Sequence, residues 1–112
     1  MMVRQSYTAV VERNHVWQGS FATEPYEVGW AGEAIFFVRL LEGRTELRGL
    51  PIRVQVSPDG IHWCDEGAVL TLSGGAEVNF VRVSHFGNWL RLAGTWPDGA
   101  AGKVIATLAL KE

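Results

Sequence analysis

The fold is decided by the stretch LPIRVQVSPDGIHW, residues 50–63. Every second residue from Ile52 to Val56 is apolar and the residues between are polar, the period-two pattern of a half-buried β-strand. Ser57-Pro58-Asp59-Gly60 follows, with proline, aspartate and glycine each at the turn position that suits its backbone preference. The stretch therefore predicts a β-hairpin that joins a strand at 50–56 to a strand at 61–65.

Within this hairpin the side chains have expected structural roles. The side-chain oxygens of Ser57 and Asp59 can accept hydrogen bonds from the N–H groups of the turn. Gly60 supplies a left-handed backbone conformation that other residues adopt at a cost. Trp63, three residues after the glycine, can fold back over the sheet. We therefore interpret Ser57, Pro58, Asp59, Gly60 and Trp63 as a structural turn.

Short apolar segments separated by glycine, proline and aspartate continue on both sides of the hairpin. None keeps a helical period beyond about ten residues with clear caps, and turn signals recur at intervals typical of sandwiches and barrels. In the segment 33–42, Ile35, Val38 and Leu41 also fit a helical stripe, but the aromatic and β-branched content favours a strand. Besides 50–56 and 61–65, the predicted strands are 6–13, 16–23, 26–28, 33–42, 68–72, 77–84, 89–96 and 103–111. The prediction is an all-β chain, a single antiparallel β-sandwich or jelly-roll-like domain over 1–112 with about eight to ten strands. Residues 1–25 are expected either as an N-terminal arm or as the first edge strands.

The predicted strand at 33–42 is apolar on both faces. Phe36, Val38 and Leu40 share one face, while Ile35 and Phe37 lie on the other. A strand with two apolar faces is either central, with both sides covered, or meets a partner on one side.

Composition excludes several classes of protein. A formal net charge of -2 argues against a nucleic-acid partner, which requires a basic surplus. No apolar run is long enough to span a membrane, and the start, MMVRQS, lacks the apolar core of a signal peptide. Cys64 is the single cysteine, so no internal disulfide is expected, which favours synthesis in the cytoplasm. We expect Cys64 to be a small buried apolar side chain.

No pattern in the sequence predicts catalysis. The three histidines, His15, His62 and His85, are not spaced as a metal-binding pair. Nucleophile-elbow, phosphate-loop and dinucleotide-binding motifs are absent from the sequence. We expect no enzymatic activity, no metal and no cofactor.

The chain has five tryptophans in 112 residues and a mean hydropathy of +0.07. A small domain has much surface for its volume, so this much apolar area predicts that another molecule covers part of it. Tryptophan and arginine are both enriched at protein interfaces. The predicted subunit contacts are Trp17, Trp30, Trp89, Trp96, Arg44 and Arg48. Exposed tryptophans could instead stack on sugar rings, so a carbohydrate-binding module is the alternative.

The stretch Ser57-Pro58-Asp59-Gly60-Ile61-His62-Trp63 resembles the Ser-x-Asp-Gly-x-x-Trp hairpin of many β-sandwich domains. These include virion and tail-associated proteins of bacteriophages, and carbohydrate-binding modules. Over 33–111 the strand pattern is similar to that of small β-sandwich structural proteins of phage-like particles. The resemblance implies a non-enzymatic structural protein that self-assembles as a homo-oligomer or docks on a capsid, tail or shell. It also implies a location on a particle or virion.

Overall fold

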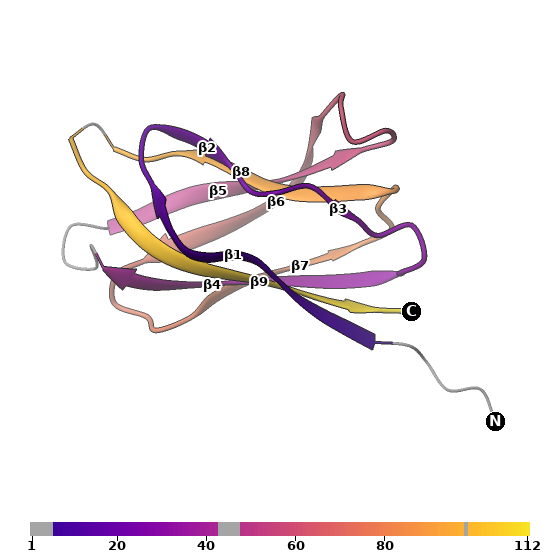
Figure 1. Ribbon diagram of the computed structural model, residues 1–112, viewed down its shortest axis with the longest axis horizontal. Coiled ribbons are helices and arrows are strands. Elements are labelled where there is room, and N and C mark those ends of the chain that lie inside the picture. The colour runs from indigo at the N-terminus through magenta and orange to yellow at the C-terminus, as the bar shows by residue number, and fades with distance from the viewer. Residues whose placement is uncertain (1–5, 43–47, 98) are drawn as a thin grey trace.

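The computed structural model describes residues 6–42, 48–97 and 99–112, in which every regular element is a β-strand (Figure 1). In chain order these are β1 (Ser6–Trp17), β2 (Ser20–Ala22), β3 (Tyr26–Glu27), β4 (Glu33–Glu42), β5 (Arg48–Ser57), β6 (Cys64–Ser73), β7 (Asn79–Ser84), β8 (Trp89–Thr95) and β9 (Gly102–Lys111). The predicted all-β sandwich is confirmed. No helix in the described part of the chain is long and apolar enough to cross a membrane.

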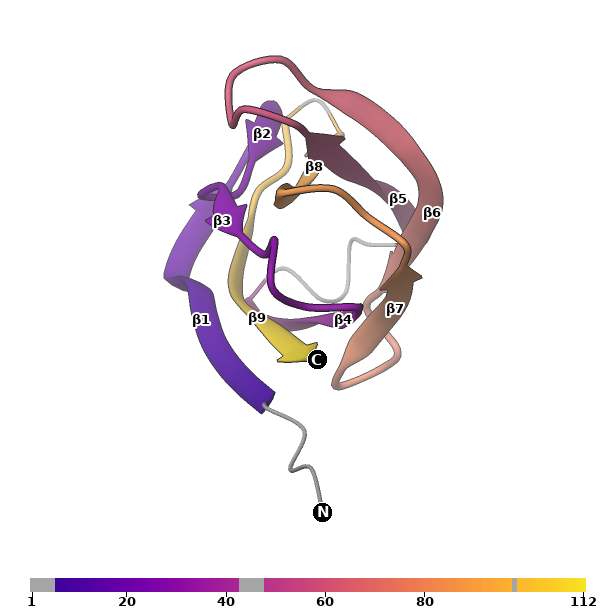
Figure 2. The same cartoon turned by 90° about the vertical axis from the view of Figure 1, so that its right-hand side faces the viewer.

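The strands form two antiparallel sheets that face each other across the core (Figure 2). The four-stranded sheet has the order β1-β9-β4-β7. The second sheet has the order β2-β8-β5-β6, and the short β3 also pairs with β8. Residues 6–22 therefore contribute an edge strand to each sheet, and do not extend away as an arm.

The core lies between the inward rows of the two sheets. In β4, Phe36, Val38 and Leu40 are buried, as their alternation predicts. In β9 every second residue from Gly102 to Leu110 is buried. From the facing sheet come Ile52, Val54, Leu70, Leu72, Leu90 and Leu92, all with almost no exposed surface. Removing this apolar area from water is the main favourable term in folding.

The turn between β5 and β6 has the hydrogen bonds that the sequence predicts. The Ser57 hydroxyl oxygen accepts from the backbone N–H of Gly60 at 2.8 Å and of Asp59 at 3.2 Å. Asp59 Oδ1 accepts from the N–H groups of Ile61 at 2.8 Å and His62 at 2.9 Å. Asp59 Oδ2 lies 2.8 Å from His62 Nδ1. These bonds, led by that from the His62 backbone, hold the pKa of Asp59 well below its ordinary value.

The prediction of separate strands at 61–65 and 68–72 is wrong. Residues 61–63 belong to the turn, and one strand, β6, runs from Cys64 to Ser73. Opposite it, Arg53 pairs with Val69 and Gln55 with Asp65, so the segment 66–68 forms a bulge against a single residue of β5. Gly67 has a φ of +115°, which glycine tolerates best. The glycine bends the strand and does not end it.

The predicted strand at 16–23 is also divided. Trp17 ends β1 and Ser20 begins β2, with Gly19 between them at a φ of +59°. This break carries the chain from one sheet to the other, as Figure 1 shows at the left.

We predict that Asp59→Ala lowers the free energy of unfolding at pH 7, since the turn N–H groups lose their acceptor. An aspartate in the unfolded chain has a pKa of about 4, and the pKa of Asp59 in the folded protein lies below that value. The stabilisation is therefore complete above that value and is lost as the pH falls through the folded-state pKa. Urea unfolding followed by tryptophan fluorescence should show the difference between wild type and variant shrinking below about pH 4. The control is Glu77→Ala, at an exposed residue, which should have the same free energy of unfolding as wild type. If the loss of stability in Asp59→Ala did not depend on pH, the role given to the Asp59 carboxylate would be contradicted.

Candidate functional site

Two of the predicted contact tryptophans are in the core. Trp17 is 1% exposed and Trp96 is 2% exposed, so their assignment as surface contacts is wrong. The Trp17 ring stacks on Phe21, with 4.2 Å between ring centroids and 13° between planes. The Trp96 ring packs directly against Gly102, which pairs with Trp17 across β1 and β9. These rings fill the end of the sandwich where the chain crosses between sheets.

The other three tryptophans differ in exposure. Trp89 is partly buried. Its ring lies close to the Gly60 backbone, because a Cβ added at Gly60 would be only 3.2 Å from the nearest ring atoms. Trp63 folds back over the sheet as expected, with the Arg91 guanidinium 4.3 Å from its ring centroid. Trp30, in the segment between β3 and β4, is 40% exposed. All five indoles are described, and Trp30 has the most exposed one.

The structure does not describe the side chains of the two predicted arginine contacts. Arg44 is in the 43–47 segment, outside the described residues, and of Arg48 only the backbone, at the start of β5, is described.

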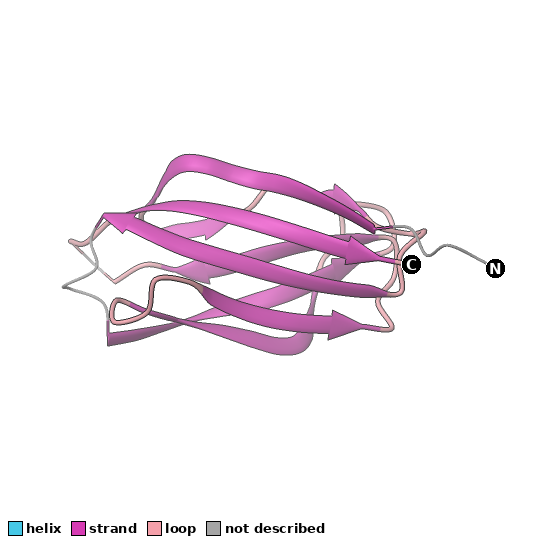
Figure 3. Cartoon of the chain, turned by 90° about the horizontal axis from the view of Figure 1, so that it is seen from below, coloured by secondary structure: helices cyan, strands magenta, loops and turns pink. Residues whose placement is uncertain are grey.

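The structure exposes an apolar surface on the outside of the four-stranded sheet, the side that Figure 3 views from below. Its residues point away from the core and come from all four strands. We call this surface the outer apolar face; it consists of Val10, Ile35, Phe37, Phe80, Ile105 and Ala109. Phe80 is 51% exposed and Val10 is 44% exposed, and the other four are partly exposed.

Strand pairing places these side chains in rows. Val10 of β1 pairs with Thr107 of β9, Thr107 pairs with Phe37 of β4, and Phe37 pairs with Phe80 of β7. The two phenylalanine rings are 6.2 Å apart between centroids. The next row contains Ala109, Ile35 and Arg82. Because directly opposite side chains on a sheet contact one another, the rows form one continuous surface across the sheet.

Charged groups border the outer apolar face. Arg82 lies over Phe80, with its guanidinium carbon 5.1 Å from the ring centroid. Lys111 and Glu33 face each other at one end of β9 and β4, and Lys103 lies at the other end of β9. A polar rim around an apolar centre is the usual arrangement of a protein interface.

The second sheet has a polar outer surface whose groups bind one another. Gln55 donates to Asp65 Oδ1 at 3.0 Å and accepts from Arg91 Nε at 2.8 Å. The Arg53 guanidinium lies 3.4 Å from Asp65 Oδ2. The Gln55 hydrogen bond, with help from Arg53, lowers the pKa of Asp65. The two sides of the sandwich therefore differ in chemistry.

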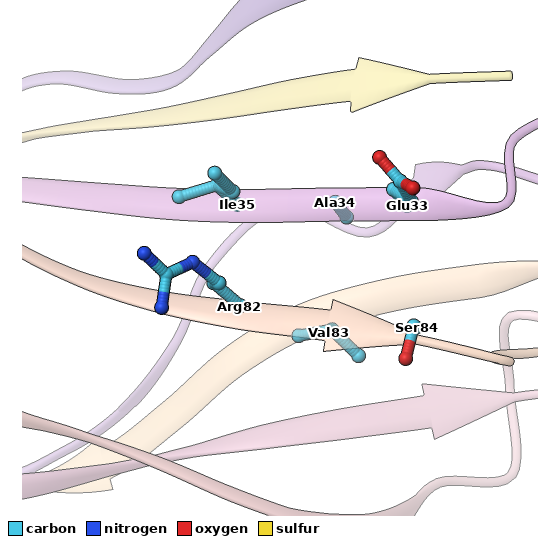
Figure 4. A pocket seen from close by; sticks show the side chains of 6 residues that line it. All are labelled: Glu33, Ala34, Ile35, Arg82, Val83 and Ser84. Atoms are coloured by element: carbon cyan, nitrogen blue, oxygen red, sulfur yellow. The ribbon is translucent and has the colours of Figure 1, made fainter.

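A hollow of about 370 Å³ lies at one end of the outer apolar face (Figure 4). Ile35 and Arg82 line it from neighbouring strands, together with Glu33 and Ser84 at the strand ends. The hollow is open to solvent, and the Glu33 carboxylate and the Ser84 hydroxyl come from directly paired residues at its edge. Among the described residues no group of three or more potential metal ligands occurs. Its chemistry suits contact with a side chain of another protein.

Cys64 is exposed, so the expectation that it is buried is wrong. It stands at the first residue of β6, directly after the turn, where its sulfur lies 3.8 Å from the Val56 carbonyl oxygen. Cys64 pairs with Val56 on the turn side of the bulge at Gly67, in a part of β6 where every residue from Cys64 to Gly67 is exposed.

The tryptophan count drew the site prediction to two residues, Trp17 and Trp96, that lie in the core. The better signal was the strand at 33–42, whose second apolar face contains Ile35 and Phe37. The same alternation in 77–84 places Phe80 on the face of the strand that does not contain the buried Val81 and Val83. Val10 and Ile105 could not be assigned to this surface without the pairing of β1 and β9.

No known protein family matches the sequence, and no curated protein does. A solved structure, that of the SPBc2 prophage-derived protein YomS, is similar over the whole chain. The TM-score is 0.65, and the match covers 100% of this chain and 97% of YomS at 6% sequence identity. A likeness at this identity shows the fold alone.

We predict that Gly102→Ala destabilises the protein, because a Cβ there would overlap the Trp96 ring and crowd Leu40. Overpacking of this kind costs about 1–3 kcal/mol, and urea unfolding should show a lower midpoint with an unchanged slope. The matched control is Gly75→Ala, where the nearest atom to a new Cβ is Ser73 Oγ at 3.7 Å. That variant should stay within about 0.5 kcal/mol of wild type. Equal effects of the two substitutions would show that Trp96 does not pack against Gly102.

Proposed function

We propose that this chain is a non-enzymatic structural protein that assembles with copies of itself or docks on a larger, phage-like particle. The observation that carries the proposal is the outer apolar face, which crosses all four strands of one sheet. The sequence supplies enough inward residues to fill the core and still places a second apolar set on β4 and β9. An apolar sheet face bordered by charge is stabilised when another protein covers it.

The size of this surface fits part of an interface. Four strands spaced about 4.8 Å apart, over three rows of outward side chains about 6.8 Å apart along the strands, give a face of roughly 400 Å². That is about half of the 800 Å² that each partner contributes to a standard interface. At about 25 cal/mol per Å², covering apolar area is favourable, but association also costs freedom of motion. The face therefore requires further contacts around it.

The architecture supports a phage-like setting. With β2 and β3 taken as one interrupted strand on β8, each sheet has four positions, an arrangement that supports the jelly-roll interpretation of the sandwich. Jelly rolls occur in viral capsid proteins and in lectins. The similar structure, YomS, is prophage-derived. Fold alone does not determine function, so the surface chemistry carries the argument.

A carbohydrate-binding module remains the alternative, and the exposed Trp30 is the feature that favours it. A sugar platform requires a free indole face. The Trp63 ring is covered by Arg91, and the Trp89 ring packs beside Gly60. Trp30 would therefore carry most of the stacking.

We predict that light scattering after size exclusion gives a mass that is a multiple of 12.4 kDa for the concentrated protein. Phe37→Thr introduces a β-branched residue, which suits a strand, and removes the central ring of the face. It should weaken association by about tenfold or more, since buried aromatic residues dominate interface energies. The matched control is Val69→Thr, which changes an exposed apolar residue on the other sheet and should leave association unchanged.

Equal weakening by both variants, or a mass of 12.4 kDa at every concentration, would contradict self-assembly through this face. Retardation of the monomer on a polysaccharide affinity gel, lost in Trp30→Ala, would favour the carbohydrate-binding alternative.

A further inference from the structure

A sandwich of two open sheets has edge strands, and each edge offers unpaired backbone N–H and C=O groups to other chains. Here the edges are β1 and β7 in one sheet, and β2 with β3, and β6, in the other. Proteins protect such edges by bulges, short strands, proline or charge. The four edges differ in how far they are protected.

Three of the edges are interrupted. The pairing of β1 with β9 has two register shifts. Asn14, within the second shift, has a φ of +51°. β6 has the bulge at Gly67. β2 and β3 have three and two residues, with Pro25 in the segment between them. The longest run without a register shift is five residues in β1, Ser6 to Val10, and four in β6, Val69 to Leu72.

The fourth edge, β7, is regular. Its six residues pair with β4 from Asn79 to Ser84 without a register shift. Within the described residues no strand pairs with its other side. The Asn79 side chain donates to the Ser73 carbonyl oxygen at 3.4 Å, and β6 lies near β7 without pairing with it as a strand. Phe80, on this edge, has the largest exposed fraction in the outer apolar face.

We propose that β7 pairs antiparallel with β7 of a second copy, which joins the two four-stranded sheets into one continuous sheet. This rests on the proposed function and names the partner as the chain itself. A twofold axis at Val81 satisfies the requirement that opposite residues lie on the same face. The inward Val81 side chains then lie opposite each other beside the two cores.

In this register Phe80 lies opposite Arg82 of the partner subunit, and the reverse pair forms on the other side of the axis. Arg82 already lies over the Phe80 ring within one chain, which shows that the two side chains are complementary. A shift by two residues toward the strand end would place Arg82 opposite Arg82 of the partner subunit. Like charges directly opposite each other are destabilising, so the register centred on Val81 is favoured over this one. A shift by two residues the other way, centred on Phe80, would pair the two Phe80 rings, and the double variant Phe80→Lys with Arg82→Glu distinguishes these two registers.

Edge pairing also makes the outer apolar face larger. The faces of the two copies become neighbours on one side of the joined sheet. Together they measure roughly 800 Å², the contribution of one partner to a standard interface. Edge pairing does not cover this enlarged face, so the joined sheet presents it to a further partner.

The test compares Phe80→Lys with Val10→Lys in sedimentation equilibrium of the full chain. Both substitutions introduce the same charge at exposed residues in the same cross-strand row, one at the β7 edge and one at the β1 edge. Lysine at position 80 faces Arg82 of the partner subunit. We expect a wild-type dimer, a dissociation constant raised by about tenfold or more in Phe80→Lys, and little change in Val10→Lys. Circular dichroism and thermal unfolding verify that each variant is folded.

A double variant tests the register. Phe80→Lys with Arg82→Glu replaces the repulsion by two symmetric opposite-charge pairs, so dimerisation should recover by about tenfold relative to Phe80→Lys alone. Failure to recover, or equal weakening by Val10→Lys and Phe80→Lys, would overturn the edge pairing, as would a wild type that is monomeric at all concentrations. An assembly weakened by Phe37→Thr and Val10→Lys but not by Phe80→Lys would overturn the edge pairing while leaving the proposed function in place.

Discussion

The packing of the two inner sheet faces against each other is the interaction on which the rest of the structure depends. The inward rows of β4, β9, β5 and β8 are apolar and nearly inaccessible to water. Trp17, Phe21 and Trp96 fill one end of this layer, and the absence of a side chain at Gly102 makes the space that Trp96 occupies. One chain therefore buries Trp17 and Trp96 without help from a partner. Because the core is complete, the apolar residues that point outward are available for another role.

Much of the fold could be predicted from local patterns. Alternation at 50–56 and 103–111 indicated both the strands and the faces that are buried, and Ser57 to Gly60 indicated the turn with its bonding groups. These features depend on neighbours in the sequence. The bulge at Gly67 was not predictable from them, since a glycine there fits a strand end equally well. Only the pairing with β5 distinguishes the two.

The candidate site was harder to predict because it depends on pairing between distant segments. Composition indicated surplus apolar area, and the prediction assigned it to the tryptophans. Trp17 and Trp96 are buried because the chain crosses between the sheets at that end, which no local pattern reports. The surplus lies instead on aliphatic residues and phenylalanines that β1, β9, β4 and β7 bring into register. The likeness to YomS at 6% identity fits this view, since a fold fixed by alternation and turns tolerates wide variation in sequence.

The central claim is that another protein covers the outer apolar face while the core of each chain stays as it is. Hydroxyl-radical footprinting of dilute and concentrated protein, read by mass spectrometry, tests this most directly. We predict that oxidation of Phe37 and Phe80 falls in the concentrated sample, while oxidation of the exposed Trp30 and Ile61 is unchanged. Equal oxidation of Phe37 and Phe80 in both samples, with protection appearing at Trp30, would contradict the account.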